Sequence, residues 1–180
     1  MDKLLENNTI RLRAPEPEDL DLLYAWENDT SLWDKGASIV PFSRYSIKQY
    51  LIDNKYDIYV DKQLRLMVTL GETGELAGAT DLYDFDPFHR RAGVGILIDR
   101  KFRGKGYALQ ALSLLEEYAF RFLNLKQLYA VIPAQNKNSI RLFTKAGYHQ
   151  TGLLEKWLST GDSFQDAWIM QKLNKTHPME

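Results

Sequence analysis

The sequence contains no cysteine among its 180 residues. This absence excludes disulfide bonds, thiolate metal ligands and a cysteine nucleophile, and no metal site of another kind is predicted. Long apolar runs are also missing, since no uninterrupted stretch approaches the length of a membrane-spanning helix. The first residues lack the apolar segment of a secretion signal. We therefore expect a cytoplasmic protein without a membrane partner.

A strong charge of either sign is absent too. Lys and Arg number 23 and Asp and Glu number 24, which gives a formal net charge of −1. A near-neutral chain has no general affinity for polyanions, so no nucleic-acid partner is expected. The hydrophobic share of 44% is ordinary for a globular protein. Residues 1–180 suit a single domain with a sizeable core.

The two common glycine signatures of nucleotide-binding folds are missing. Gly104 and Gly106 form a G-x-G pattern, but Leu109 stands where the dinucleotide-binding fingerprint needs its third glycine. No G-x-x-x-x-G-K-[ST] sequence occurs, so a P-loop is excluded. A nucleotide or phosphate enzyme of these classes is therefore disfavoured.

The sequence does contain a glycine turn between a strand and a helix. Residues 94–98 are short, apolar and branched, as in a buried strand. Apolar residues then recur at three- and four-residue steps from 108 to 122, as on one face of a helix. The start of a helix leaves four N–H groups without helical partners and carries a partial positive charge. This order of elements predicts an anion site at the turn.

The residues of the turn suit such a site. Gly104 and Gly106 lack a Cβ, so the backbone can take positive φ and come close to a ligand. Arg103 and Lys105 add two cations. A phosphate or pyrophosphate is the most natural ligand. The alternative is a tight turn with two solvated basic residues, and the flanking strand and helix favour the anion site.

The remaining elements follow from alternating or helical apolar patterns. We expect strands at 10–13, 64–70, 76–80, 91–98, 127–132, 148–158 and 164–173. We expect a helix from Pro17, a second capped by Ser43, and a short one capped by Asn136, Asn138 or Ser139. Residues 28–41 are expected to form a loop, and residues 71–74 and 83–90 two turns.

This order of elements resembles the GCN5-related N-acetyltransferase (GNAT) superfamily over nearly the whole chain. The likeness is carried by the strand 94–98, by Arg103–Ala108 with its helix, and by 136–148, which reads Asn-Lys-Asn-Ser-Ile-Arg-Leu-Phe-Thr-Lys-Ala-Gly-Tyr. Residues 89–92 and 161–166 look most like the spermidine/diamine and ribosomal-protein N-terminal acetyltransferases. The resemblance implies an α/β (α+β) fold, with a mixed, mostly antiparallel twisted sheet of six or seven strands and about four helices.

The resemblance also implies acetyl-CoA as the acetyl donor. Backbone amides of Arg103 through Ala108 would hold the pyrophosphate, and main-chain groups of Ile96 and Ile98 would pair with the pantetheine arm like an added strand. Asn136 would hydrogen-bond the arm or the thioester end, although a helix cap is its alternative role. The residues implied to contact the coenzyme are Ile96, Leu97, Ile98, Arg103, Gly104, Lys105, Gly106, Tyr107, Ala108, Asn136, Ser139 and Phe143.

Attack of an amine on a thioester needs a base and a fixed hydrogen-bond donor. An amine with a pKa of about 10 is mostly protonated at neutral pH, so a carboxylate or a water chain must take its proton. By resemblance, a strand amide near Leu97 is the donor for the oxyanion. Asp81, Asp84 and Asp86 are the candidate bases, and of these we favour Asp84. The alternative is a solvated acidic turn, which could also attract a cationic acceptor.

Two positions depart from the family pattern. Many relatives carry a Glu one residue after the position of Ala92, where this chain has Gly93. Many carry at the position of Phe143 a Tyr that can act as an acid toward the leaving thiolate, and Phe143 has no hydroxyl. Loss of one acid–base group typically costs about 10²–10⁴ in rate. Activity would therefore depend on substitute groups.

Two functions remain open from the sequence. The first is an acetyl-CoA-dependent N-acetyltransferase that acts on a primary amine (a polyamine, a small amine or a protein N-terminus) by direct attack in a ternary complex. The second is a catalytically weak acyl-CoA-binding sensor or scaffold, which Gly93 and Phe143 support. The final strands often build a homodimer in this family, so a homodimer is expected by resemblance.

Overall fold

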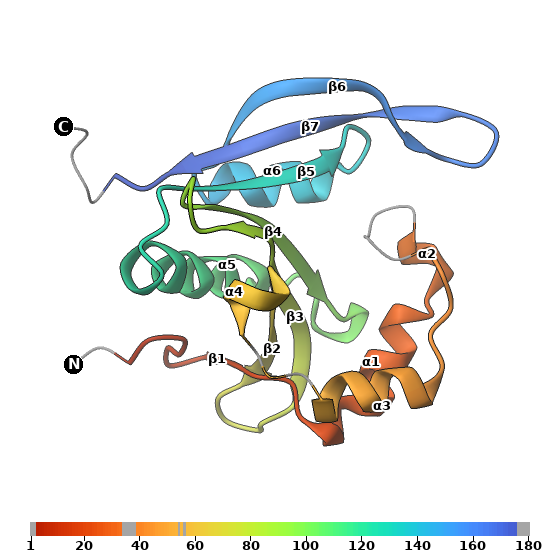
Figure 1. The fold of residues 1–180 in the computed structure, drawn as a ribbon, viewed down its shortest axis with the longest axis vertical. Coiled ribbons are helices and arrows are strands. Elements are labelled where there is room, and N and C mark those ends of the chain that lie inside the picture. The colour runs from red at the N-terminus through yellow and green to blue at the C-terminus, as the bar shows by residue number, and fades with distance from the viewer. Residues whose placement is uncertain (1–2, 34–38, 54, 56, 176–180) are drawn as a thin grey trace.

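A seven-stranded sheet runs through the molecule in the order β1-β2-β3-β4-β5-β7-β6 (Figure 1). The computed structural model describes residues 3–33, 39–53, 55 and 57–175. β4 and β5 are parallel, and the other neighbours are antiparallel, so the expected mixed sheet is confirmed. The strands are β1 (Ile10–Arg13), β2 (Leu64–Leu70), β3 (Leu76–Asp86), β4 (Arg91–Ile98), β5 (Gln127–Pro133), β6 (His149–Ser159) and β7 (Phe164–Leu173).

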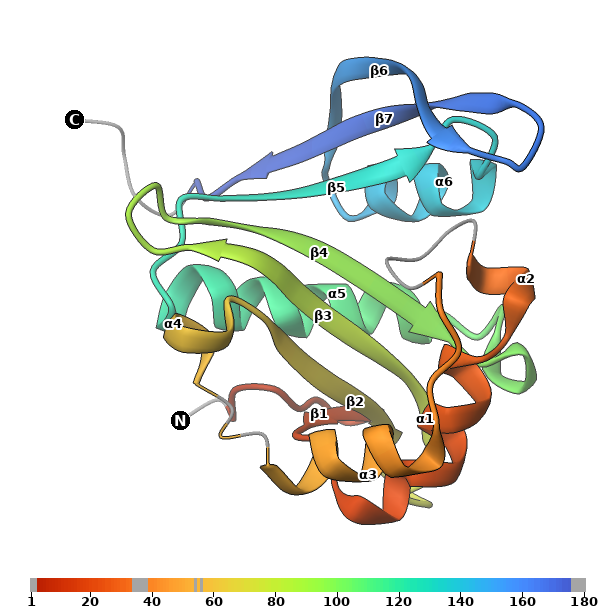
Figure 2. The same cartoon turned by 45° about the vertical axis from the view of Figure 1, so that its right-hand side comes forward.

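Helices cover both faces of the sheet (Figure 2). α5 packs on β1, β3 and β4 on one face, while α1 and α3 pack together on the other. The α-helices of the described residues are α1 (Leu20–Glu27), α2 (Thr30–Trp33), α3 (Arg44–Asp53), α4 (Ile58–Asp61), α5 (Tyr107–Glu117) and α6 (Lys137–Lys145). Three further helical turns are η1 (Pro17–Asp19), η2 (Arg100–Phe102) and η3 (Tyr118–Phe122). None of the helices described here is long and apolar enough to span a membrane.

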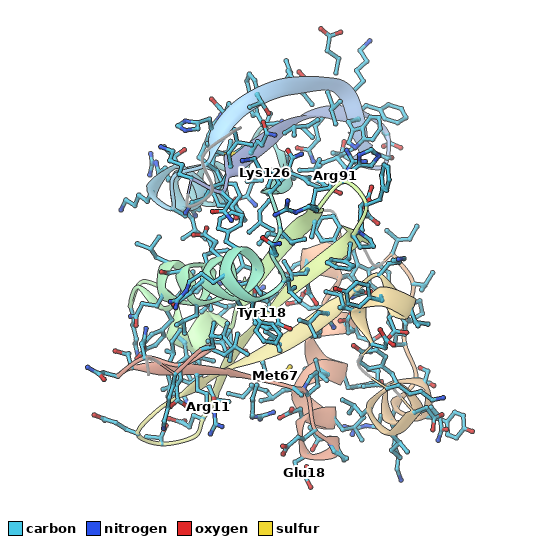
Figure 3. The ribbon with its side chains drawn as sticks, turned by 60° about the vertical axis from the view of Figure 1, so that its left-hand side comes forward. Arg11, Glu18, Met67, Arg91, Tyr118 and Lys126 are labelled. Carbon is cyan, nitrogen blue, oxygen red and sulfur yellow. The ribbon has the colours of Figure 1, made fainter. Side chains whose placement is uncertain are left out.

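The alternation of side chains along β2 builds the two cores. Leu66 and Val68 join the large cluster beneath α5, whereas Met67 joins the smaller cluster with Leu23 and Ile47 from α1 and α3. Met67 is fully buried, and Figure 3 shows its place in the interior beside the strands. Both faces of the central strands are thus covered, which fixes the register of the sheet.

The sheet divides between β4 and β5. The two strands pair at three rows only, which end at Gly93 opposite Tyr129. β4 continues to Ile98 and β5 to Pro133 without further pairing between them, and Figure 2 shows the two ribbons moving apart. The main-chain groups that face this divergence have no sheet partner on that side, so those that no side chain engages are available to a ligand.

The predicted end of the strand at residue 80 is wrong. β3 continues to Asp86, and the expected turn at 83–90 shrinks to the residues after β3. Asp84, Asp86 and Pro87 are turn formers, but here the pairing to β4 overrides their local preference. The register shifts between Tyr83 and Asp86, and Asp84 has a φ of 48°, so these residues form a bulge rather than a turn.

The helices also differ from the expectation in number and shape. α2 lies inside the expected loop, and α4 was not predicted, because each is a single short turn without a clear apolar period. The long helix after the glycine turn changes at Tyr118 into the wider turn η3, where Leu123 N–H donates to the Tyr118 carbonyl at 3.0 Å. Ser43 caps α3 as predicted, since its Oγ accepts from Ser46 N–H at 3.0 Å.

Candidate functional site

The glycine turn has the geometry that the sequence predicts. Gly104 and Gly106 both have positive φ, 75° and 80°, and Gly106 is the residue that precedes α5. A Cβ on either residue would meet no atom within 4 Å, so glycine is required here by the backbone angle and not by crowding. The turn follows β4 and η2 directly, which places it at the wide end of the divergence.

The turn presents a row of unused backbone donors. In the described part of the chain, the N–H groups of residues 104–108 donate no hydrogen bond, and the first helical bond runs from Gln110 to Gly106 at 3.3 Å. Arg103 does not join this row with its side chain, because its Nε donates to the Ile98 carbonyl at 2.9 Å. Lys105 Nζ lies 5.6 Å from the Phe102 ring centroid. The turn therefore offers a ligand chiefly amides and the helix start.

The edge of β4 next to the turn is open. Asp99 N–H donates to the Ala77 carbonyl at 2.9 Å, and alternation along an antiparallel pair then turns the main-chain groups of Ile96 and Ile98 away from β3, toward the divergence. The Leu97 carbonyl leans over Gly78, where a Cβ would meet its oxygen at 2.1 Å. The backbone of 96–98 is therefore the wall of the divergence on the β4 side.

The other wall begins at β5 and α6. Asn136 precedes α6, and its Oδ1 accepts from Ser139 N–H at 3.1 Å, so the helix-cap role exists in the structure. A cavity of about 550 Å³ adjoins this helix start and is lined by Pro133, Asn136 and Gln165 among others. A second cavity of about 270 Å³ lies between α1 and the end of β4, against Trp26 and Leu97.

Phe143 is buried in the large core, with 3% of its surface exposed. Its ring meets the Tyr148 ring edge to face, with centroids 4.9 Å apart. The Tyr148 hydroxyl is sealed from solvent beside Glu116, and burial together with this carboxylate raises the pKa of Tyr148. Lys172 Nζ joins Glu116 at 2.5 Å and the Ala146 carbonyl at 2.6 Å, which ties the end of α6 to the core.

The three candidate carboxylates have different surroundings. Asp81 Oδ1 accepts from Arg65 Nε at 2.7 Å, and the same guanidinium also binds Glu27 of α1. Burial opposes the charge of Arg65, but the two carboxylates outweigh it and raise its pKa. Asp86 pairs with Arg91 at 3.4 Å and accepts from His89 N–H, and its pKa is lowered. Figure 3 shows Arg91 beside Lys126, where β4 and β5 begin.

Asp84 is the most accessible of the three. Its side chain is exposed on the bulge of β3, and its Oδ2 lies 3.4 Å from the Tyr129 hydroxyl. Burial and then this carboxylate raise the pKa of Tyr129. Asp84 therefore stands next to the last row that joins β4 and β5, at the closed end of the divergence.

Comparison with known proteins decides the family. The family described as "Acetyltransferase (GNAT) domain" matches residues 9–149. The chain belongs to the GNAT acetyltransferase family. Members of this family use acetyl-CoA as the acetyl donor, so the predicted recognition, enzyme class and coenzyme are confirmed at the level of the family.

Individual relatives of this GNAT protein agree with that assignment. It is 29% identical over 150 residues to spermidine N(1)-acetyltransferase of Escherichia coli, covering 82% of this chain and 76% of the relative. It is 28% identical over 174 residues to an uncharacterized N-acetyltransferase of Bacillus licheniformis, covering 96% and 97%. A spermidine N-acetyltransferase of Vibrio cholerae, solved in complex with CoA and spermine, has the same fold with a TM-score of 0.83 and 24% identity, covering 93% and 96%.

The structure explains why this GNAT acetyltransferase has glycine at position 93. A Cβ there would lie 2.3 Å from two ring atoms of Tyr83, which stands opposite Gly93 on β3. Tyr129 flanks Gly93 on the other side, and the two tyrosine rings meet edge to face with centroids 5.9 Å apart. The space above Gly93 is thus filled by aromatic side chains from both neighbouring strands.

Sequence reasoning missed Tyr83, Tyr129 and Arg65 of this GNAT protein. The tyrosines come together only through the pairing of β3, β4 and β5, and no local pattern reports that pairing. The usable signal was Gly93 itself, because a glycine inside a strand often marks the close approach of another group. Arg65 neutralises part of the expected acidic cluster, and its place opposite Asp81 follows from the β2–β3 register.

Proposed function

We propose that the protein transfers the acetyl group of acetyl-CoA to a primary amine by direct attack in a ternary complex. The observation that carries this proposal is the row of unused N–H groups at 104–108 beside the open edge of β4. These amides and the start of α5 suit a diphosphate, and the Ile96 carbonyl and the Ile98 N–H suit the amides of a pantetheine arm. When bound, the coenzyme supplies an acetyl group activated as a thioester.

The chain's own groups supply the rest of the site. Asp84 is proposed to take the proton of the attacking amine, directly or through water, because it is exposed beside the closed end of the divergence. The N–H of Ile96, next to Leu97, is proposed to hold the carbonyl oxygen, because the Leu97 N–H itself faces β3. Asp81 and Glu27 share the guanidinium of Arg65, so the three side chains together carry a net negative charge. This charge favours a cationic acceptor such as a polyamine or a small diamine.

The location and assembly are part of the proposal. The relatives with spermidine N-acetyltransferase names support a cytoplasmic enzyme. One Vibrio cholerae relative was solved as a dodecamer, and we propose that this chain forms at least a homodimer. Size-exclusion chromatography with light scattering tests this assembly, and a monomer at all concentrations would contradict it.

Substitution in the glycine turn tests the proposed coenzyme site. We expect Gly106→Ala to weaken CoA binding at least about 10-fold in titration calorimetry, because an L residue at this positive φ is strained by roughly 1–2 kcal/mol and turns the amides away. Gly74→Ala is the matched control: Gly74 has a φ of 72° and open space around it, but lies in the β2–β3 turn. Equal affinity of the two variants would contradict the proposal.

Turnover separates an enzyme from a binding module. We expect release of free CoA thiol when acetyl-CoA is mixed with spermidine, spermine or a short diamine, and less or none with a neutral amine-free analogue. Tight CoA binding without turnover on any amine or N-terminal peptide would favour the sensor or scaffold function instead.

A further inference from the structure

The side chain of Tyr83 lies at the closed end of the divergence, and the proposed function gives it no role. Tyr83, Gly93 and Tyr129 stand in one row across β3, β4 and β5, and this is the last row at which β4 and β5 pair. Since Gly93 has no side chain, the Tyr83 ring lies over the β4 backbone and meets Tyr129 there. The phenol thus reaches from β3 across β4 to the floor of the divergence.

The hydroxyl of Tyr83 is oriented from the β5 side. Val131 lies on β5 just beyond the last paired row, and its N–H approaches the Tyr83 oxygen, which offsets only part of the rise that burial causes in the pKa of the phenol. In the described residues, the Tyr83 hydroxyl itself donates no hydrogen bond. Its oxygen is therefore approached by a donor, while its own proton remains available to an acceptor in the divergence.

The environment keeps Tyr83 protonated. Burial is the largest cause and raises the pKa of Tyr83 to about 12, and Tyr129, Asp84 and Asp81 add to this. At neutral pH the phenol is a hydrogen-bond donor and not a base. A free thiol has a pKa of about 8.5, so a thiolate does not remove the proton of such a phenol but accepts a hydrogen bond from it.

The other aromatic side chains considered for this role do not present a free hydroxyl to the divergence. Phe143 has none, and the Tyr148 hydroxyl is sealed in the core beside Glu116. The Tyr129 hydroxyl is directed to Asp84. Among these ring positions, Tyr83 is the one with a free donor at the floor of the divergence.

We propose that Tyr83 is a further catalytic residue, whose hydroxyl donates a hydrogen bond to the sulfur that leaves during acetyl transfer. This inference rests on the proposed function. In the reaction the amine nitrogen bonds to the acetyl carbon, the C–S bond breaks and its electron pair stays on sulfur. The amine proton goes to Asp84 or to water, and the phenol keeps its own proton. Tyr83 thus stabilises the charge on sulfur without transferring a proton.

The product complex tests this role without any acceptor. We expect the thiol of CoA to ionise at lower pH when bound to the wild-type protein than when bound to Tyr83→Phe, with the ratio of thiolate to thiol changed about 10-fold, since one charge-assisted hydrogen bond is lost. The ultraviolet absorbance of the thiolate, followed during a pH titration of the protein–CoA complex, measures this. Tyr118→Phe is the matched control, because Tyr118 is half-buried in η3 and stacks on Phe122.

A second variant displaces the phenol and keeps it in the chain. Gly93→Ala places a Cβ where the Tyr83 ring lies, so the ring must swing away. It should raise the pH of CoA thiol ionisation as Tyr83→Phe does. With an active acceptor, Tyr83→Phe should lower kcat about 10- to 100-fold, at or below the lower end of what acid–base groups supply. The affinity for acetyl-CoA should be unchanged, because the thioester has no ionisable thiol.

These experiments distinguish failure of the proposed function from failure of the proposed role of Tyr83. If the wild-type protein does not bind CoA in titration calorimetry, the proposed function fails. If it binds CoA but the thiol ionises alike in wild type and Tyr83→Phe, the role of Tyr83 is overturned while the proposed function stands. An effect of Tyr118→Phe as large as that of Tyr83→Phe would also overturn it.

Discussion

At the scale of single residues, two glycines inside the sheet are required by contacts and not by turns. The Tyr83 ring occupies the place where a Cβ on Gly93 would lie, and the Leu97 carbonyl occupies the corresponding place at Gly78. The two cases differ in how they can relax. A tyrosine ring can rotate away from a new methyl group, whereas a backbone carbonyl moves only with its strand.

Gly78→Ala is therefore expected to lower the free energy of unfolding by about 1–3 kcal/mol, as overpacking of a core does. The new Cβ would lie 2.1 Å from the Leu97 oxygen, so β3 and β4 must separate locally. Gly152→Ala in β6 is the control, because no atom lies within 4 Å of its Cβ position. Urea unfolding of both variants measures the difference, and equal midpoints would show that the close approach is not kept in solution.

At the scale of elements, α6 is the helix whose start has two candidate roles. Asn136 caps it through Oδ1, which leaves the amide NH₂ for a ligand. The cap and the ligand contact use different atoms of one side chain. They can therefore both hold, and a suitable substitution separates them.

Asn136→Ser keeps a capping oxygen but removes the NH₂ group. We expect its stability to stay close to that of the wild type, whereas Asn136→Ala should lose about 1 kcal/mol. If Asn136 also holds the coenzyme, both variants lose CoA affinity to a similar extent. Thermal unfolding and calorimetric titration of the pair measure these effects. Full CoA affinity in Asn136→Ser would leave the cap as its single role.

The elements with a strong periodic signal were predictable, and those fixed by distant contacts were not. The strand into the glycine turn and α5 follow from local pattern, as does the cap of α3 by Ser43. The end of β3 was missed because its last residues prefer turns and are held extended by β4. The change from α5 to η3 has no clear local signal in the sequence. In the site, the geometry of the glycine turn was predictable, while Tyr83 depends on pairing between strands.

At the scale of the whole molecule, polar contacts fasten the N-terminal elements to the sheet. Arg13 of β1 binds Asp19 of η1 through two bonds of 2.7 and 2.8 Å, and Asp19 is 5% exposed. Trp26 of α1 donates to Asp99 at 2.9 Å, which fixes the first helix to the end of β4. The N-terminal elements are thus held to both the edge and the centre of the sheet.

The Arg13–Asp19 pair predicts a loss of stability in acid. Burial opposes ionisation of Asp19, but bonds from Arg13 and from Glu16 N–H outweigh it and lower its pKa below the ordinary 3.8. A lowered pKa stabilises the fold above that ordinary value, and this contribution is lost as the pH falls through the folded pKa. Asp19→Asn should cost about 2 kcal/mol at pH values near 7, and the difference from the wild type should shrink in acid.

Urea unfolding at neutral and acid pH checks this expectation. Asp162→Asn, in the exposed turn between β6 and β7, serves as the control. A difference between wild type and Asp19→Asn that is as large in acid as at neutral pH would contradict the assignment.

The parting of β4 and β5 has a mechanical consequence. Three paired rows between β4 and β5 join the two parts of the sheet, β1 to β4 and β5 to β7. β4 continues for five residues, or about 16 Å, beyond this seam. A rotation of about 5° at the seam displaces the far end by roughly 1.4 Å. A ligand that contacts both parts of the sheet near the far ends of β4 and β5 therefore restrains their relative rotation, even when each contact is weak.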